Sequence, residues 1–594
     1  MPKTRILYLF SVVLCLSSGC VDGMKMIERC GDGVLDPGEE CDGVPLVSCE
    51  GYHVPTGHLR CTANCRLDRS ACGGRCGDGV IDADFGEQCE GSDINGGTCQ
   101  DLGYFSGLLS CSPACVYDTS ACEHCGDGVV QDQWGELCDG ADPGAVTCAD
   151  FGGYFGAPAC EPTCTAASAG TCRQALQWGS DQSEQALAVA LDAEGNLYVT
   201  GYTTGILAGT RRYGFMDVFL VKVSPRGERL WTRQWGSRSY SMGFDVAVDV
   251  ASGEIYVVGE TTHSMDGQHH VVGQTDAFLS KFDGDGLLLW TRQWGTTSND
   301  TAWGLTVDAG GDVYVVGDTN GGFEGQLNVG ESDAFLSRFD GDGQILWTRQ
   351  WGSTWYDEAR GVAVGPSGDL YVVGFAGEAV DGEAYLGSFD LFLTRYTPEG
   401  EKRWTRLFGT PAQDSGYGIK IAPDEVIHLI GWTKGDLTDD LHEPLDTDLL
   451  WVQYDSEGNL LKTRQWGTGE QDSVGGLAID PGGHVFMTGF TRGALTDNSS
   501  DGETDVFVTM FEPDGTMAWT RQFGTPEVDV AKGLAVDAAG NVFLVGTTDG
   551  DLLGGTAAGG GDLFLMGIHY VKQASEWMPS PSQPPKFMLH SQVN

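Results

Sequence analysis

Six aromatic residues between positions 240 and 417 have the chemistry of a ligand-binding surface. Each follows an aromatic–glycine pair, in a segment that varies between the copies of a repeat. Exposed aromatic rings can stack on sugar rings or anchor another protein, whereas the alternative is that they pack between neighbouring sheets. We predict that the binding residues are Tyr240, Phe244, Trp303, Trp355, Tyr356 and Tyr417.

A carboxylate recurs six residues after the aromatic residue of these pairs. It is present in six of seven copies, and Ser241 takes its place in the other. Recurrence favours a structural role, such as accepting hydrogen bonds from loop amides, over a single catalytic acid. A ring of such acids near an axis could also attract a cation. The carboxylates belong to Glu184, Asp300, Asp357, Asp414, Asp472 and Asp529.

Common sequence motifs of catalysis are missing from the chain. It contains no HExxH, no GxSxG and no GxxxxGK(S/T), and no single repeat concentrates a histidine, an acid and a nucleophile. We therefore predict no catalytic residues and no enzymatic activity. The alternative is an exported hydrolase or lyase that acts on glycans with two acids about 5–10 Å apart near the axis.

The elements that position these residues come from a repeat whose mark is WTRQWG or a close variant. Successive marks are 57 to 59 residues apart, and seven marks at one period define a repeat protein. The aromatic residues of the marks are Trp178, Trp235, Trp294, Trp351, Phe408, Trp466 and Phe523.

Each repeat contains four short runs rich in Val, Tyr, Phe and Trp, separated by Gly and Asp turns. One example is 304–308, 313–317, 333–339 and the WTRQWG that follows. Four such strands make an antiparallel meander, and seven meanders arranged radially bury one another's faces as in a β-propeller. The long, variable loops, from strand two to three and from strand four to the next repeat, share one face, where we expect the function.

The ends of the repeat region predict ring closure. Residues 562–570 form a third strand without a fourth, and residues 174–179 form a fourth strand without a sheet. If the latter strand completes the sheet of the former, the ring has no free edge. We therefore predict an all-β chain with a seven-bladed β-propeller over residues 174–572, closed by its N- and C-terminal strands.

The repeats resemble the bacterial β-propeller repeat family known as SBBP, whose members carry the same DAFL, WTRQWG and AVDxxGNVYVVG elements. The resemblance extends over residues 174–572 and is specific because it recurs. It implies a seven-bladed propeller and implies no particular reaction.

The arginine of the WTRQWG mark has a predicted structural role. If strands three and four pair through their tight turn, Arg292 lies opposite Asp276 and Arg349 lies opposite Asp333. We predict an ion pair within each blade at these positions.

The N-terminus is typical of an export signal. Lys3 and Arg5 precede an apolar stretch over residues 6–16, which is too short to span a bilayer. Small residues followed by Cys20 resemble a bacterial lipoprotein signal, which implies that Cys20 is lipidated; a plain secretory signal is the alternative. We predict a signal peptide over residues 1–19 and a lipidated tether over 20–29. Proline and polar residues predict a disordered tail over 573–594.

All 20 cysteines lie before Arg173. Apart from Cys15 and Cys20, they form three groups of six, over residues 30–72, 76–122 and 125–172. Even counts in an exported chain favour three disulfides per group over zinc, with the pairing left open. Modules of this size need such cross-links for stability. The segments open with CGDG and resemble the cysteine-rich repeat of myxobacterial surface proteins.

Acidic residues near each CGDG could hold calcium, which prefers oxygen ligands. The alternative is that Gly-Asp-Gly forms turns and that the carboxylates bond backbone amides or water. Apart from calcium, we predict no cofactor. The candidate ligands are Asp32, Asp36, Glu39, Asp78, Asp82, Glu87, Asp127, Asp132 and Glu136.

The chain carries 84 acidic and 34 basic residues, which gives a net charge of −50. Such a surface repels nucleic acid and anionic lipid. We predict a monomeric lipoprotein of the bacterial cell envelope, held at the outer membrane only by its lipid. Its predicted function is to bind or scaffold a polysaccharide or a protein through the loop face of the propeller. A further alternative makes the cysteine-rich modules the adhesive part.

Overall fold

The structure is a computed structural model in which residues 174–569 are described, except for 266–273, 438–446, 496–501 and 553–558. Before residue 174 it describes 35, 39–42, 47–48, 58–68, 76–123 without 78, 84–85, 103 and 105, 130, and 136–173 without 141 and 163. The chain divides into two compact units, Met1–Gly140 with Pro162–Cys164, and Ala141–Glu161 with Thr165–Asn594. Within the described residues, no helix has the length and apolar character needed to cross a membrane.

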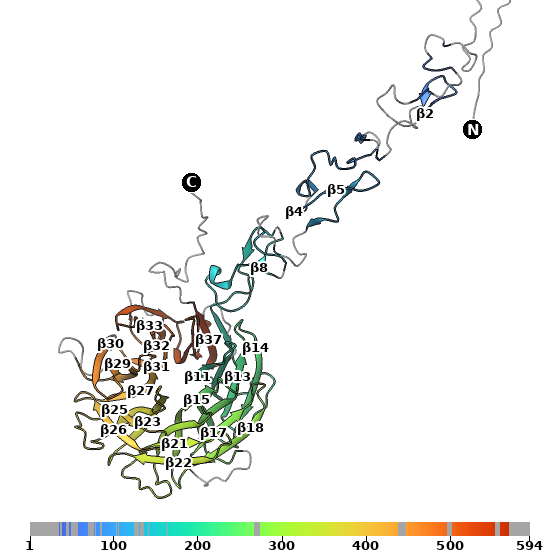
Figure 1. Ribbon diagram of the computed structural model, residues 1–594. Helices are drawn as coiled ribbons and strands as arrows, with labels where there is room; N and C mark the ends of the chain where they lie inside the picture. Colours follow the sequence, from blue (N-terminus) through green and yellow to red (C-terminus); the bar gives the residue numbers. More distant parts are fainter. Residues whose placement is uncertain are drawn as a thin grey trace, which may run out of the picture. The chain divides into compact units, whose positions relative to one another are not determined.

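Seven four-stranded antiparallel sheets surround an axis (Figure 1). In six of them the strands follow one another in chain order, and the first strand is innermost. These six blades consist of β11 (Glu184–Leu191), β12 (Leu197–Thr203), β13 (Asp217–Val223) and β14 (Arg229–Trp235); β15 (Ser241–Val248), β16 (Ile255–Thr261), β17 (Asp276–Phe282) and β18 (Leu288–Trp294); β19 (Asp300–Val307), β20 (Val313–Thr319), β21 (Asp333–Phe339) and β22 (Ile345–Trp351); β23 (Asp357–Val364), β24 (Leu370–Ala376), β25 (Asp390–Tyr396) and β26 (Lys402–Phe408); β27 (Asp414–Ile421), β28 (Ile427–Thr433), β29 (Asp448–Tyr454) and β30 (Leu460–Trp466); β31 (Asp472–Ile479), β32 (Val485–Thr491), β33 (Asp505–Phe511) and β34 (Met517–Phe523).

The seventh blade joins the two ends of the repeat region. It contains β35 (Asp529–Val536), β36 (Val542–Thr548) and β37 (Asp562–Ile568), and its fourth strand is β10 (Ala175–Trp178). β10 pairs antiparallel with β37, with Trp178 opposite Leu563. The predicted seven-bladed propeller and its closure are therefore confirmed.

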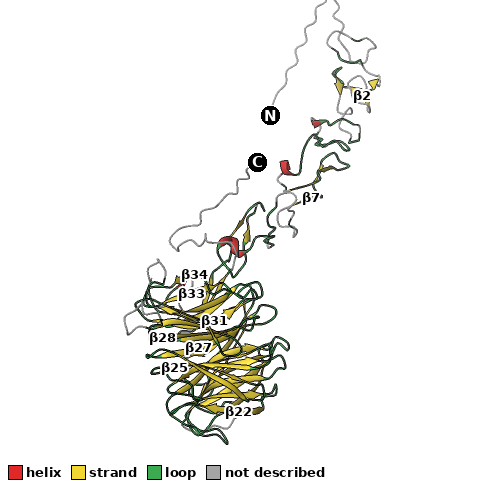
Figure 2. Cartoon of the chain, turned by 60° about the vertical axis from the view of Figure 1, so that its left-hand side comes forward, coloured by secondary structure: helices red, strands yellow, loops and turns green. Residues whose placement is uncertain are grey.

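Neighbouring sheets supply each other's core. One cluster joins Tyr314 and Val316 of β20 to Val362 of β23 and Val372 of β24, and all four side chains are buried. Strands dominate the propeller, as Figure 2 shows. Because each sheet buries its two faces against the sheets on either side, the apolar surface is fully covered only when the ring is complete.

The predicted ion pair within each blade is wrong. Arg292 lies opposite Leu279, because the turn between β17 and β18 is centred on Asp285, where the Asp283 amide donates to Leu287 O, and the register shifts again between Lys281 and Phe282. Its guanidinium instead donates to the carbonyl oxygens of Gly343, at 3.0 Å, and Asp342, at 2.7 Å, in the next blade. Asp276 accepts a hydrogen bond from Gln293 at 2.8 Å.

The second predicted pair fails in the same way. Arg349 lies opposite Leu336 and donates to Gly400 O, at 2.8 Å, in the next blade. Asp333 accepts a hydrogen bond from Gln350 at 2.9 Å. The arginine of the mark therefore links neighbouring blades. The glutamine of the mark donates a hydrogen bond to the aspartate that begins the third strand of its own blade.

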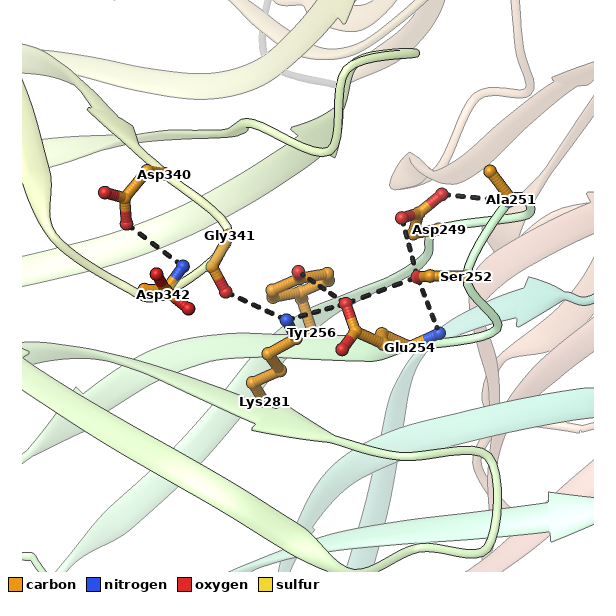
Figure 3. A network of polar contacts seen from close by, with 9 residues as sticks. All are labelled: Asp249, Ala251, Ser252, Glu254, Tyr256, Lys281, Asp340, Gly341 and Asp342. Carbon is orange, nitrogen blue, oxygen red and sulfur yellow. Dashed lines mark hydrogen bonds and ion pairs between the residues drawn. The ribbon is translucent and has the colours of Figure 1, made fainter.

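A second cation fastens blades to one another near the short turns. Lys281 of β17 lies 2.6 Å from Glu254 of its own blade and donates to Gly341 O of the next blade at 2.8 Å (Figure 3). Arg338 and Arg395 hold the same position in the two following blades and donate to Pro398 O and Ser456 O. Each contact crosses a blade boundary. Hydrogen bonds between blades therefore stabilise the ring in addition to its apolar core.

The recurring carboxylates are structural, as predicted. Asp357 accepts the Ser353 amide at 2.5 Å, and Asp414 accepts the Thr410 amide at 2.6 Å. Where Ser241 replaces the acid, its hydroxyl accepts the Ser237 amide at 2.9 Å. These groups fix the loop that leads from one blade into the next.

The cysteine-rich region is stabilised by disulfides. In the second module, disulfides join Cys76 to Cys115, Cys89 to Cys111 and Cys99 to Cys122. All six cysteines of this module are thus paired, as predicted, and none is a thiolate that could bind zinc. Cys41–Cys61 in the first module joins the second and fourth cysteines, as Cys89–Cys111 does in the second module. Cys148–Cys172 in the third module joins the third and sixth cysteines, as Cys99–Cys122 does.

The strands and helical turns of the cysteine-rich region are short. The residue boundaries of the three modules stay a prediction. The elements are β1 (Val47–Ser48), β2 (His58–Cys61), β3 (Leu67–Asp68), η3 (Gln100–Leu102), β4 (Ser106–Gly107), β5 (Ser110–Cys111), β6 (Tyr117–Asp118), β7 (Cys122–Glu123), η5 (Cys148–Phe151), β8 (Ala159–Cys160) and β9 (Ala167–Ser168).

Part of the third module packs into the propeller. Phe155 is 1% exposed and lies in the cluster between the seventh and first blades. Tyr154 packs edge-on against Phe543, with ring centroids 4.9 Å apart, and stacks on His569 at 4.4 Å. Gly567 stands where other blades carry Lys281 or Arg338, and a Cβ there would lie 2.3 Å from Tyr154. The aromatic pair of this module therefore fills the place of a missing cation.

Candidate functional site

Each innermost strand contains a β-bulge near its middle. At this point the register with the second strand shifts, so one residue per blade has no partner in the ladder. We call these seven residues the bulge ring. Its members are Leu187, Phe244, Trp303, Arg360, Tyr417, Gly475 and Lys532.

The bulge ring lines a cavity along the propeller axis. The cavity has a volume of about 760 Å³, and residues from all seven innermost strands form its wall. We call it the axial channel. A volume of this size falls in the range of small-ligand pockets, which is about 300–1,000 Å³.

A second set of residues lies on the second strands toward the long loops, and two of them, Tyr202 and Glu260, line the cavity. These are the sixth residues of the second strands, paired with the second residues of the innermost strands, as Glu260 is with Met242. We call them the mouth ring. It consists of Tyr202, Glu260, Asp318, Phe375, Trp432, Phe490 and Thr547.

Acids gather on one side of the mouth. Asp318 accepts a hydrogen bond from the Trp303 indole at 2.7 Å, and Glu260 accepts one from Thr301 at 2.9 Å. Burial raises the pKa of Asp318 to about 7, and the nearby charge of Glu358 adds to this shift. Burial also raises the pKa of Glu260. These acids hold protons more tightly than ordinary carboxylates, as general acids in enzymes do.

Arg360 links the acids to the aromatic wall. Its guanidinium carbon lies 3.8 Å from the centroid of the Trp303 ring, and the same group pairs with Glu358. Trp303 also packs against Phe244, with ring centroids 4.5 Å apart. Because guanidinium and indole planes attract each other when desolvated, this stack fixes the side chains that project into the channel.

A buried acid stands deeper in the channel. Asp245 follows Phe244 directly and accepts a hydrogen bond from the Leu305 amide of the next blade at 3.0 Å. Burial raises the pKa of Asp245 to about 6, although the Leu305 amide and Lys420 oppose the shift. This carboxyl therefore ties two innermost strands together beside the bulge ring.

Asp318 gives a prediction about pH. Its pKa is about 7 in the folded chain against an ordinary value of 3.8, so folding favours the protonated form. Its contribution to stability is full below about pH 4 and is lost as the pH rises through about 7. The uncharged Asp318→Asn should match the parent near pH 4 and be more stable than the parent above pH 7, measured by urea unfolding across this range.

The matched control is Asp285→Asn in an exposed turn, which should follow the parent curve at every pH. If the free energies of unfolding of Asp318→Asn and the parent changed in parallel from pH 4 to 8, the raised pKa of Asp318 would be rejected.

The predicted binding aromatics divide into two groups. Phe244, Trp303 and Tyr417 belong to the bulge ring and line the axial channel together. The other three, Tyr240, Trp355 and Tyr356, lie outside the channel, with 43%, 51% and 42% of their surface exposed. Tyr240 packs against Phe215, and Trp355 packs against Tyr356. Their role in binding stays a prediction.

Sequence reasoning missed the charged residues of the channel. Those that line it are Asp245, Glu260, Arg360, Lys420 and Lys532, and Asp318 and Glu358 interact with them. A signal was available, because every bulge-ring residue stands nine positions after the aromatic residue of the mark, as Arg360 does after Trp351. Comparing the seven copies at this position reveals aliphatic, aromatic, cationic and glycine residues, whereas the flanking positions are mostly alanine or glycine.

The candidate calcium ligands are described only in part. Asp32, Asp36, Asp78, Asp127 and Asp132 lie outside the described residues. Glu39 and Glu136 each lie within 4.8 Å of a second carboxylate and of a cysteine sulfur.

The remaining two candidates, in the second module, are bonded within the fold. Glu87 accepts the Asp82 amide at 2.9 Å. Close by, Glu90 accepts the Gly77 and Gly79 amides, which lower the pKa of Glu90. Calcium binding stays a prediction.

Fold and channel together define a closed seven-bladed β-propeller built from a repeated sheet. Two stretches, residues 289–324 and 518–554, match the family model described as SBBP, a beta-propeller repeat. The chain therefore contains SBBP repeats, as the resemblance implied.

A curated relative shares part of the chain. Regulatory protein FlaEY of Caulobacter vibrioides is 26% identical over 375 residues, which is 56% of this chain. The aligned region spans 39% of the length of that relative.

The solved structures to which the chain is similar are distant in sequence. Polysaccharide lyase Uly1 has a TM-score of 0.38 at 10% identity, covering 66% of this chain and 89% of its own. A gluconolactonase from Xanthomonas campestris has a TM-score of 0.31 at 14% identity, covering 59% and 90%. Likenesses of this size leave the function to be argued from the channel itself.

Proposed function

We propose that the protein is a non-enzymatic binding protein of the bacterial cell envelope that captures a glycan at the mouth of the axial channel. The observation that carries the proposal is the bulge ring. Its seven positions are equivalent in the fold, yet they bear an aliphatic, three aromatic, two cationic and one glycine residue. Packing alone would favour similar residues at equivalent positions, whereas recognition of one asymmetric ligand favours different ones.

A glycan suits the channel better than an extended protein surface does. The walls combine half-buried aromatic faces with hydrogen-bonding side chains, the two features that bind sugar rings and their hydroxyls. A protein ligand would have to insert a loop into the channel or use the exposed aromatic residues at its rim. The proposal therefore places the ligand at Phe244, Trp303 and Tyr417.

The disulfides, together with the predicted export signal, support an envelope setting for this function. Disulfides form and persist in oxidising compartments, which include the cell envelope. The proposal holds the chain at the outer membrane through a lipid on Cys20. Mass spectrometry of the native protein would test it: a diacylglycerol-modified Cys20 is expected, and an unmodified N-terminus after residue 19 would contradict it.

Retention on a glycan and envelope-extract array tests the binding site. The exported chain from Val21 should retain a glycan, and Trp303→Ala should lose at least tenfold in affinity because the channel wall is removed. Trp355→Ala is the matched control, since it deletes an exposed tryptophan outside the channel. Loss of retention in Trp355→Ala alone would move the site to the loops, and unchanged binding in Trp303→Ala would reject the channel as the site.

A hydrolase or lyase is the second candidate function, and one observation favours it. Asp318 has a pKa of about 7, raised chiefly by burial and also by Glu358, which is the environment of a general acid beside a second carboxylate. Under this alternative the array would release new products instead of only retaining glycans. Asp318→Asn should then abolish release without loss of folding, whereas release that persists in this variant would exclude Asp318 as the acid.

A further inference from the structure

Lys532 is a cation of the axial channel that lacks a counter-ion. It is the bulge-ring residue of β35 and lines the channel wall. Its ammonium group lies 5.5 Å from the centroid of the Phe490 ring. Among the described residues, no carboxylate forms an ion pair with it and no acceptor receives a hydrogen bond from it. The other bulge-ring cation, Arg360, has both a carboxylate partner and an aromatic partner.

The surroundings of Lys532 disfavour a bare charge. Burial lowers the pKa of Lys532, and the charge of Arg360 lowers it further. An ammonium group that is partly withdrawn from water and has no counter-ion costs stability, so its presence at the channel wall is not explained by packing alone. A negatively charged group brought by a ligand would supply the missing partner.

The acids of the channel are already engaged. Asp318 is held by the Trp303 indole, Glu260 by the Thr301 hydroxyl and Glu358 by Arg360. Because burial raises the pKa of Asp318 to about 7, this acid is only partly ionised near neutral pH and attracts a cationic ligand weakly. Lys532 is therefore the charged group of the channel that is left to pair with a charged ligand.

We propose that the ligand of the axial channel is a saccharide with an anionic substituent, a carboxylate or a sulfate, which pairs with Lys532 while a sugar ring packs on Phe490. This inference rests on the proposed function and deepens it by naming the ligand class. The remaining aromatic members of the mouth ring, Tyr202, Phe375 and Trp432, give further ring faces for stacking.

The net charge of the protein restricts the form of this ligand. A chain with a net charge of −50 repels a long polyanion, and the repulsion acts over about 8–10 Å at physiological salt. One acidic sugar inside the channel is in contact with Lys532 and is shielded from the outer surface. The ligand is therefore captured by a single acidic unit, such as a chain end, and affinity should fall little as salt rises to 0.5 M.

Matched oligosaccharides test the inference by calorimetry on the full exported chain. The probes are trigalacturonate, its fully methyl-esterified counterpart and a sulfated disaccharide from chondroitin. We expect the parent to bind an acidic probe at least tenfold more tightly than the neutral ester. Lys532→Met should remove this preference, and Lys532→Arg should keep most of it.

Stability distinguishes recognition from structure. Loss of an unpaired buried charge should leave Lys532→Met as stable as the parent or more stable, measured by urea unfolding, whereas a structural lysine would make the variant less stable. Tighter binding of the sulfated probe than of trigalacturonate would support the anionic class and assign sulfate as the substituent.

Three results would count against the inference. Equal binding of trigalacturonate and its ester would overturn it while leaving the proposed function intact. Sodium sulfate binding as tightly as the sulfated sugar would overturn its saccharide part. If the array and all three probes showed no retention at all, the proposed function itself would fail.

Discussion

Phe155→Ala is expected to lower the free energy of unfolding of the propeller by about 3–5 kcal/mol, the usual cost of deleting a buried phenylalanine ring. Phe155 precedes the first repeat, yet it is 1% exposed in the cluster formed by the first and seventh blades. A Cβ at Gly227 of the first blade would lie 2.8 Å from the Cβ of Phe155 and 2.9 Å from its ring. The adjacent Gly156 amide donates to Arg226 O at 2.9 Å, which fixes the same contact through the backbone.

The reason for this dependence lies in the closing strand. At four other blade boundaries the fourth strand supplies a tryptophan and an arginine that pack on the turn glycine of the next blade, as Trp290 and Arg292 do on Gly343. β10 begins at Ala175 and has neither residue at these positions. Phe155 occupies the site on Gly227, so the third cysteine-rich module completes the seventh boundary.

Urea unfolding of the full chain, followed by tryptophan fluorescence, measures the effect. The matched control is Phe215→Ala in the propeller itself, where the side chain is 53% exposed and should contribute less than about 1 kcal/mol. Equal stability of the two variants would contradict the role given to Phe155. The same reasoning predicts that a chain starting at Gln174 is less stable than the parent by at least the Phe155→Ala amount.

Gly317→Ala is expected to cost about 3 kcal/mol and to weaken glycan retention as well. A Cβ at this position would lie 1.8 Å from the Thr301 carbonyl oxygen, and the Phe335 ring leaves no space on its other side, at 2.7 Å. Gly317 lies opposite Ala302, where the bulge of β19 begins. The added methyl group must push the bulge away, which costs the energy of an overpacked core and turns Trp303 out of position.

The effect of Gly317→Ala is measured by urea unfolding together with the glycan array. Gly341→Ala is the control in the same blade, because its Cβ would meet no atom closer than 3.8 Å. A Gly317→Ala variant with parental stability and parental retention would show that the bulge does not position the channel wall.

Much of the fold could be predicted because it is repeated. The period of 57 to 59 residues and the lone strands at both ends specify seven sheets and their closure, since no other arrangement buries every face and edge. The structural role of the recurring acids, such as Asp357, also followed from recurrence. The partner of Arg292 could not be predicted, because the centre of the β17–β18 turn and the register shift beside it place Arg292 opposite Leu279, with its guanidinium on the next blade.

The site could be predicted only in part. Aromatic residues such as Trp303 stand out in sequence, but their position in the channel depends on a bulge whose geometry leaves no motif. Lys532 looks like an ordinary strand residue until seven strands meet at the axis and partly bury it in the channel wall. The contact of Phe155 joins segments with no sequence pattern in common, so it appears only in three dimensions.

The central claim is that the ligand binds in the axial channel. Hydroxyl-radical footprinting, read by mass spectrometry with and without the retained glycan, tests it directly. The account predicts protection of Phe244, Trp303 and Tyr417 with no change at Trp355 and Tyr356. Protection of Trp355 and Tyr356 with the channel residues unchanged would contradict it and place the ligand on the exposed loops.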